Sequence, residues 1–173
     1  MTSCPDDLRE LYYEFGRAAE MAQVMETEAG NLALVYATML VDMPRVTDEQ
    51  REFFRALVQD VNARTFGNLF RQIQKLGQID DGIIATVNDA LEKRNYLTHK
   101  FFRKHNLAIH SVEGRETMLA EIREIQGSLS LAHTVLSGMT ESLSRLLAKL
   151  FGRNLLSEHE ALTLMGEGKR VDI

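Results

Sequence analysis

The chain has 173 residues, of which 45% are hydrophobic and 26% are charged, and its formal net charge at pH 7 is −5. This length and composition suit one globular domain with a sizeable core, so we predict a single helical domain over residues 1–173. The negative charge argues against a general nucleic-acid binder covered in positive charge, but it leaves room for a local basic site.

The cysteine content and the length of the apolar runs indicate the cellular compartment in which the protein is expected. The single cysteine, Cys4, cannot form an internal disulfide, which favours a reducing compartment. The N-terminus carries Asp6 and Asp7 and lacks an apolar core, so we expect no signal peptide. The longest apolar run, 32–41, has about half of the ~20 residues that a membrane-spanning helix needs. We therefore expect a soluble, cytoplasmic protein that does not bind a membrane.

A long apolar stripe, with steps that alternate between three and four residues, predicts a helix near residues 6–41. Asp6 or Asp7 suits its start, and Pro44 ends it because proline cannot continue the hydrogen-bond ladder. The stripe consists of Leu8, Leu11, Phe15, Ala18, Ala22, Met25, Ala29, Leu32, Tyr36 and Met39. Such a stripe indicates the core of a helical bundle.

The middle of the chain predicts two or three shorter helices. Thr47 suits the start of the first, and a change of apolar phase at Thr65 separates it from the second. Asp80 or Asp81 can cap the last of them, which we predict to continue to about Asn106. The residues expected on one face of this last helix are Ile84, Val87, Leu91, Arg94, Thr98 and Phe101.

A second long stripe predicts a helix near residues 112–151 that ends at Gly152. It consists of Met118, Ile122, Ile125, Leu129, Ala132, Leu136, Met139, Leu143, Leu146 and Leu150. We predict a short terminal helix and a tail over 152–173. The chain as a whole predicts an all-α, antiparallel helical bundle of two long helices and two to three shorter ones, with its core at about 6–151.

Arg94 interrupts the apolar face of its helix at a position where a core helix would carry leucine. A guanidinium keeps its charge there, so it needs a partner or solvent. Asn95 and His99 are neighbours on the helix, and the long Arg94 side chain can reach the same space, so we predict that the three edge a pocket. The alternative is a buried ion pair between Arg94 and an acidic residue of the first helix, such as Glu14, Glu20 or Glu28.

The same stretch is locally basic. Between positions 92 and 104, Glu92 is the one acidic residue, and the basic residues are Lys93, Arg94, Lys100, Arg103 and Lys104. A basic island of this kind attracts phosphate, so we predict that its lysines and Arg103 bind a ligand that carries phosphate. The alternative for Lys100, Arg103 and Lys104 is a solvated helix end, because basic side chains complement the dipole at a helix C-terminus.

The string Arg94-Asn95-x-x-x-His99, late in a helix of a small bundle, resembles the Arg-x4-His signature of the HEPN superfamily of all-α proteins. That signature often begins with Arg-Asn, as it does here. The resemblance implies metal-independent endoribonuclease activity at a site where the motif helices of two domains meet, often in toxins or in defence against phage. By position it makes Arg94 and His99 catalytic, with Asn95 as a polar support. A His-x-Tyr subgroup has a modifiable tyrosine where this chain has Phe101, so that role is not carried over.

The residues suit this chemistry. RNA cleaves itself when its 2′-hydroxyl is deprotonated and the leaving oxygen is protonated, and histidine can serve either step near neutral pH. An arginine can direct two hydrogen bonds to the phosphate as its charge builds. Because one motif supplies one histidine, we predict a homodimer that brings His99 of both copies to one cleft.

The leading hypothesis is thus an RNA-binding protein and candidate endoribonuclease, whose partners are RNA, a second copy and a protein such as an antitoxin. The alternative is a non-catalytic helical dimer that acts as a protein-interaction or regulatory module, with Arg94 in a structural ion pair. We predict no cofactor and no metal site, since His105 and His110 lack the spacing of a metal-binding motif.

Overall fold

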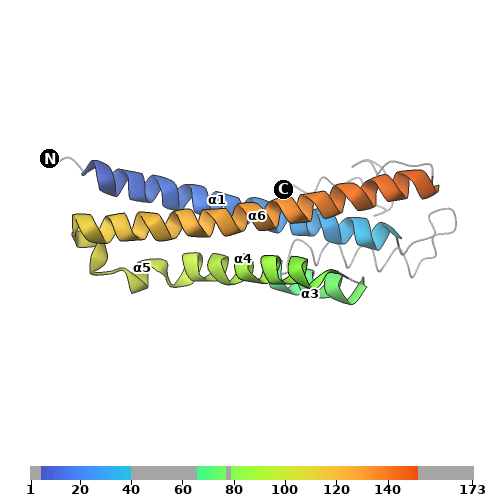
Figure 1. Ribbon diagram of the computed structural model, residues 1–173, viewed down its shortest axis with the longest axis horizontal. Helices are drawn as coiled ribbons and strands as arrows, with labels where there is room; N and C mark the ends of the chain where they lie inside the picture. Colours follow the sequence, from blue (N-terminus) through green and yellow to red (C-terminus); the bar gives the residue numbers. More distant parts are fainter. Residues whose placement is uncertain (1–4, 40–65, 77–78, 152–173) are drawn as a thin grey trace, which may run out of the picture. The chain divides into compact units, whose positions relative to one another are not determined.

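The computed structural model describes residues 5–39, 66–76 and 79–151, and this part of the chain forms a helical bundle (Figure 1). Its elements are α1 (Asp6–Met39), α3 (Phe66–Leu76), α4 (Asp81–His99), α5 (Phe101–Lys104), the 3-10 turn η2 (Ala108–His110) and α6 (Val112–Phe151). The all-α prediction, with two long helices and shorter ones between them, is confirmed. The helix predicted to start at Thr47 and the short helix and tail predicted at 152–173 lie outside the described residues.

The structure divides into two compact units, each of which takes part of both long helices. The first unit contains α1 as far as Thr27 and the chain from Ile79 to Leu136. The second unit contains α1 from Glu28, the helix α3, and α6 from Ser137. The single domain stays a prediction. All predicted site residues belong to the first unit.

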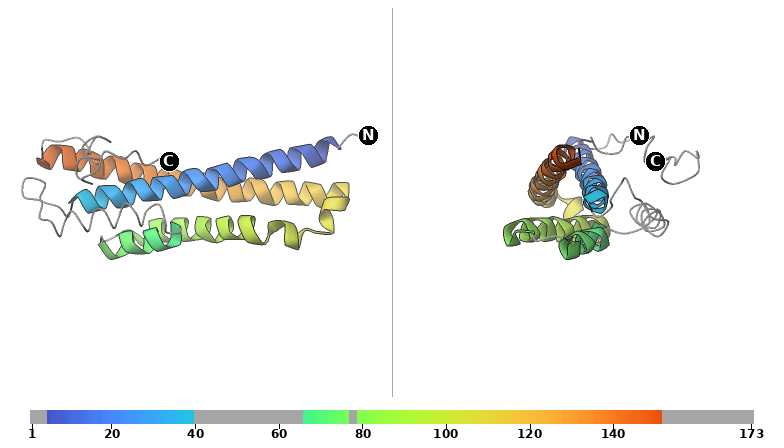
Figure 2. Two further views of the ribbon diagram at one scale, coloured as in Figure 1. Left: turned by 180° about the vertical axis from the view of Figure 1, so that it is seen from behind. Right: turned by 90° about the vertical axis from the view of Figure 1, so that its right-hand side faces the viewer.

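In the first unit, segments of α1, α4 and α6 lie side by side, and η2 reverses the chain between α5 and α6 (Figures 1 and 2). The helix α4 runs antiparallel to both long helices, in agreement with the predicted antiparallel packing. The long helices themselves run in the same direction, since Asp7 pairs with Arg115 and, further along both helices, Glu10 pairs with Arg123.

The core of the first unit follows the predicted stripes of both long helices, with one correction on α4. The predicted α4 face included Leu91 and Thr98, but Leu91 is only partly buried and Thr98 is exposed. Its buried residues are Val87, Ala90 and Leu97, followed by Phe101 in α5. Arg94 lies four residues after Ala90 and three before Leu97, so it still occupies a core position on the helix. The long helices contribute Leu11, Ala18, Ala22, Met25, Met118, Leu119, Ile122, Ile125, Leu129, Ala132 and Leu136.

The helix that carries Arg94 ends at His99, so its predicted continuation to Asn106 is wrong. The backbone of Lys100 leaves the helical conformation, with φ −126° and ψ −24°, and α5 follows as a separate short helix. We attribute the break to aromatic packing, because Phe101 is fully buried and the Phe102 ring centroid lies 4.7 Å from that of Phe15. Neither proline nor glycine is present here to mark the break in the sequence.

None of the helices in the described part of the chain has the apolar length that crossing a membrane requires.

Candidate functional site

Arg94 is bound to α1 by an ion pair. Its Nη2 atom lies 2.5 Å from Oε1 of Glu26, and the two side chains are 23% and 29% exposed. Oε1 is buried and makes no hydrogen bond, so its interaction with Arg94 is ionic. The predicted ion pair with the first helix is thereby confirmed, although its partner is Glu26 and not one of the three glutamates named from the sequence.

Asn95 holds a second nitrogen of the same guanidinium. Nη1 of Arg94 donates a hydrogen bond of 2.9 Å to Oδ1 of Asn95, which is itself exposed on α4. Glu26 and Asn95 together set the plane of the guanidinium, because two of its nitrogens are engaged in different directions. Its Nε atom has no hydrogen-bond partner among the described residues.

His99 is the last residue of α4 and is exposed. Within the described part of the chain it forms neither a hydrogen bond nor an ion pair. At 100° per residue it points about 140° away from Arg94 around the helix axis. Within one chain Arg94 is therefore hydrogen-bonded to Asn95, whereas His99 lies one turn beyond Asn95 on α4 and is bonded to neither residue.

Lys93 is neutralised by acidic residues. Its Nζ atom lies 3.1 Å from a carboxylate oxygen of Glu124 and 3.3 Å from one of Asp89, and it donates a 2.7 Å hydrogen bond to Ser128. Partial burial acts to lower the pKa of Lys93, but the hydrogen bonds to Glu124 and Asp89 outweigh it and raise the pKa above its usual value. This lysine is committed to linking α4 with α6.

The remaining basic residues divide into paired and unpaired ones. Lys104 donates a hydrogen bond of 2.9 Å to Glu121, whose carboxylate is the main cause of the raised pKa of Lys104. Lys100 and Arg103 are exposed and form no ion pair within residues 5–39, 66–76 and 79–151. Of the five cations in the predicted basic island, these two are the ones with charge available to a ligand.

A polar cluster that sequence reasoning missed lies between α4, α5 and α6. Glu121 accepts from Lys104, and its other oxygen lies 2.5 Å from Nε2 of His105, which is 8% exposed. The Tyr96 hydroxyl lies 3.4 Å from the same Nε2. Partial burial acts to raise the pKa of Glu121, but hydrogen bonds from Lys104, Tyr96 and His105 outweigh it and hold the pKa below its usual value.

This cluster has no local sequence signal, because Glu121 is brought to His105 only by the packing of α6 on α5. The carboxylate of Glu121 is thus the structural partner of His105.

Among the described residues, no group of three or more histidine, cysteine, aspartate or glutamate side chains could hold a metal ion.

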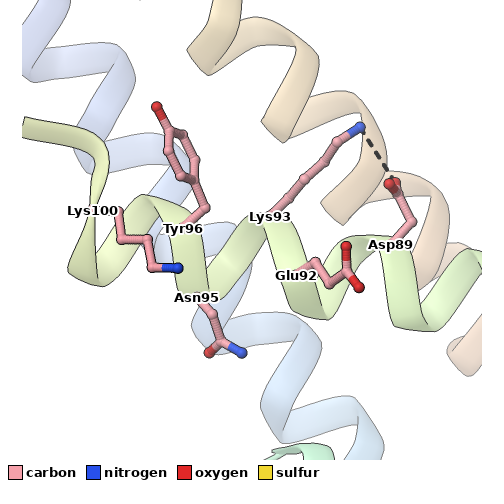
Figure 3. Close-up of a pocket in the computed structure, with 6 residues that line it drawn as sticks. All are labelled: Asp89, Glu92, Lys93, Asn95, Tyr96 and Lys100. Carbon is pink, nitrogen blue, oxygen red and sulfur yellow. Dashed lines mark ion pairs between the residues drawn. The ribbon is translucent and has the colours of Figure 1, made fainter. Parts of the chain in front are cut away.

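A surface pocket of about 520 Å³ lies along α4 (Figure 3). It is lined by Asp89, Glu92, Lys93, Asn95, Tyr96 and Lys100. Lys93 and Tyr96 extend from one side of the helix and Asn95 from the other, and Lys93 turns to Asp89. Of the three residues predicted to edge a pocket, Asn95 lines this one, whereas Arg94 and His99 do not. Two acidic and two basic residues line it, so it offers no excess of positive charge.

Comparisons of the chain with protein-family models, with curated proteins and with solved structures found no match. The chemistry of α4 is therefore inferred from its own residues. The last residue of α4 is the exposed His99, and the exposed Lys100 and Arg103 follow it without an ion pair among the described residues. Arg94, whose orientation is set by Glu26 and Asn95, lies five residues before His99. Such a set can bind phosphate and exchange protons with it.

Proposed function

We propose that the chain binds RNA at the exposed end of α4 and cleaves it as a homodimer, without a metal ion. The observation that supports this most is that His99 is exposed and forms no hydrogen bond or ion pair with a described residue. Histidine is the side chain that most often serves as a general acid or base. The Arg-x4-His string, which resembles that of the HEPN superfamily, supplies the link to RNA.

In the proposed reaction, one imidazole removes the proton of a 2′-hydroxyl, and that oxygen forms a bond to the adjacent phosphorus. The bond from phosphorus to the 5′-oxygen of the next nucleotide breaks, and a second imidazole protonates this leaving oxygen. The products are a 2′,3′-cyclic phosphate and a 5′-hydroxyl. Since one chain has one His99, the second imidazole belongs to His99 of another copy related by a two-fold axis.

Arg94 has an electrostatic part in this proposal. Glu26 and Asn95 engage two of its nitrogens, and the remaining Nε–H donates to a phosphate oxygen as negative charge builds on it. Lys100 and Arg103 attract the flanking phosphates, which fixes the position of the strand without reading its sequence. Lys93, Asn95 and Lys104 support the helix end through their contacts within the chain.

The test is cleavage of labelled RNA in excess chelator by the wild type, His99→Ala and His110→Ala. His110 is an exposed histidine outside the string and serves as the matched control. We expect the wild type and His110→Ala to cleave equally and His99→Ala to be slower by about 10²-fold or more, the usual contribution of a general acid or base. Absence of cleavage by the wild type, or equal rates for His99→Ala, would refute the nuclease.

The second candidate is a non-catalytic helical module that binds a second copy or a protein partner. The observation that favours it is the Arg94–Glu26 ion pair, which commits the guanidinium to the fold. In this case the protein forms a dimer in sedimentation but neither binds nor cleaves RNA, and His99→Ala changes neither property. Both candidates predict a dimer in sedimentation, so the cleavage and RNA-binding assays on the same samples separate them.

A further inference from the structure

An aromatic cluster runs from the core of the first unit to its surface, beside the end of α4. Phe101 is fully buried, and its ring centroid lies 5.3 Å from that of Phe102 and 5.8 Å from that of Phe15. Phe102 also lies 4.7 Å from Phe15. The outermost member is Tyr12 of α1, whose ring lies 5.9 Å from Phe102 and is 52% exposed. The cluster is thus anchored at one end and open to solvent at the other.

Tyr12 differs from its neighbour Tyr13 in what supports its ring. Tyr13 is 65% exposed, and the contact found for its ring is with Arg17 on the same helix, 5.9 Å from the ring centroid. The ring of Tyr12 is tilted by 34° against Phe102, which two further phenylalanine rings hold in place. An exposed ring with a rigid backing loses little conformational freedom when a flat ligand stacks on it.

The basic residues that flank Phe101 and Phe102 in the sequence favour an anionic ligand. Arg103 directly follows Phe102 in α5, and Lys100 directly precedes the helix; both are exposed and unpaired among the described residues. The acidic residues closest to Tyr12 along α1, Glu10 and Glu14, are neutralised by Arg123 and Arg17 respectively. An exposed ring backed by Phe102, together with two basic residues that flank the phenylalanine pair and have no ion pair among the described residues, suits a ligand that combines a flat ring with phosphate.

We infer that Tyr12, backed by Phe102, is a stacking site for an unpaired nucleobase of an RNA strand whose phosphates contact Arg103 and Lys100. This site deepens the proposed function and rests on it. Single-stranded RNA exposes its base faces to aromatic side chains, whereas the bases of a duplex are stacked on one another and cannot reach them. The site therefore selects RNA with unpaired bases.

The experiment measures the fluorescence anisotropy of a labelled single-stranded oligoribonucleotide whose 2′-oxygens are methylated, so that binding is observed without cleavage. The variants are Tyr12→Ala, Tyr12→Phe and, as the matched control, Tyr13→Ala. We expect Tyr12→Ala to weaken binding about tenfold, within the range known for the loss of one base stack, and the other two to bind like the wild type. A duplex of the same sequence is expected to bind more weakly and to be insensitive to Tyr12→Ala.

Circular dichroism and thermal unfolding of Tyr12→Ala test whether the helices are intact. If the alanine variant unfolds, Tyr12→Leu, which keeps apolar bulk but removes the ring, takes its place and is expected to show the same loss of affinity. The stacking site is refuted if Tyr12→Ala binds as tightly as the wild type, or if Tyr13→Ala loses as much affinity. His99-dependent cleavage together with unaffected binding by Tyr12→Ala refutes the site and leaves the nuclease standing. Binding that depends on Tyr12 without any cleavage supports the site and refutes the nuclease.

Discussion

Arg94 of α4 and Glu26 of α1 form an ion pair in which Nη2 lies 2.5 Å from Oε1, at the edge of the core of the first unit. The arginine occupies a position between Ala90 and Leu97 that would otherwise suit an apolar side chain. Its charge is tolerated there because the carboxylate is close and both side chains keep partial access to water. The pair therefore both links the two helices and orients the guanidinium.

Removal of the Glu26 carboxylate should destabilise the protein. In Glu26→Ala the partly buried guanidinium keeps its charge but loses its partner, and we expect a loss of about 1–2 kcal/mol in the free energy of unfolding, between the values for exposed and buried pairs. Urea denaturation measures this change in the free energy of unfolding. The control is Glu20→Ala, because Glu20 is exposed on the same helix. This substitution should change the free energy of unfolding by less than about 0.5 kcal/mol. Equal effects of the two substitutions would show that the ion pair does not stabilise the fold.

Glu121 should make stability depend on pH in the acidic range. Its pKa in the folded chain lies below the ordinary value of 4.5, since the donors around it outweigh the effect of burial. The stabilisation is therefore fully present above pH 4.5 and is lost as the pH falls through the folded-state pKa. We expect Glu121→Gln to cost about 1–3 kcal/mol at pH 7, as for hydrogen bonds to a charged group, and to lose less stability on acidification.

Thermal unfolding between pH 7 and pH 3 of the wild type, Glu121→Gln and the exposed control Glu116→Gln tests this expectation. The control removes one carboxylate of the same helix outside the cluster, so its profile should follow that of the wild type. Parallel profiles for the wild type and Glu121→Gln would contradict a stabilising role for the Glu121 carboxylate.

Two glycines of α6 should respond in opposite directions to the same substitution. A methyl group on Gly114 would lie 2.0 Å from the backbone oxygen of Ala108 in η2, so the turn would have to shift. We expect Gly114→Ala to destabilise the protein by about 1–3 kcal/mol, the usual cost of overpacking. At Gly127 a methyl group meets nothing within 4 Å, and Gly127→Ala should stabilise α6 by about 0.5–1 kcal/mol.

The melting temperatures of the two variants, measured side by side, decide this prediction. An unchanged or higher melting temperature for Gly114→Ala would mean that the close approach of η2 to α6 does not restrict residue 114, and a lower one for Gly127→Ala would contradict the expected gain in helix stability.

Much of the helical framework was predictable from local patterns. The second long helix was predicted near 112–151 and observed at Val112–Phe151, and the side chain of Asp80 accepts a hydrogen bond from the backbone nitrogen of Gly82 at the start of α4, as its position suggested. These features depend on residues within a few turns of one another, so the sequence alone contains them. The interruption by Arg94 was visible for the same reason.

Contacts between distant segments were decided only by the tertiary structure. Arg94 pairs with Glu26 rather than with another glutamate of α1 because of the position of α4 along the axis of α1. No local sequence pattern specifies that position. The break at Lys100 likewise follows from the packing of Phe102 on Phe15, and the cluster at Glu121 from the packing of α6 on α5. Periodicity indicates which face of a helix is buried, but the register between helices is set by side chains that meet only after the chain has folded.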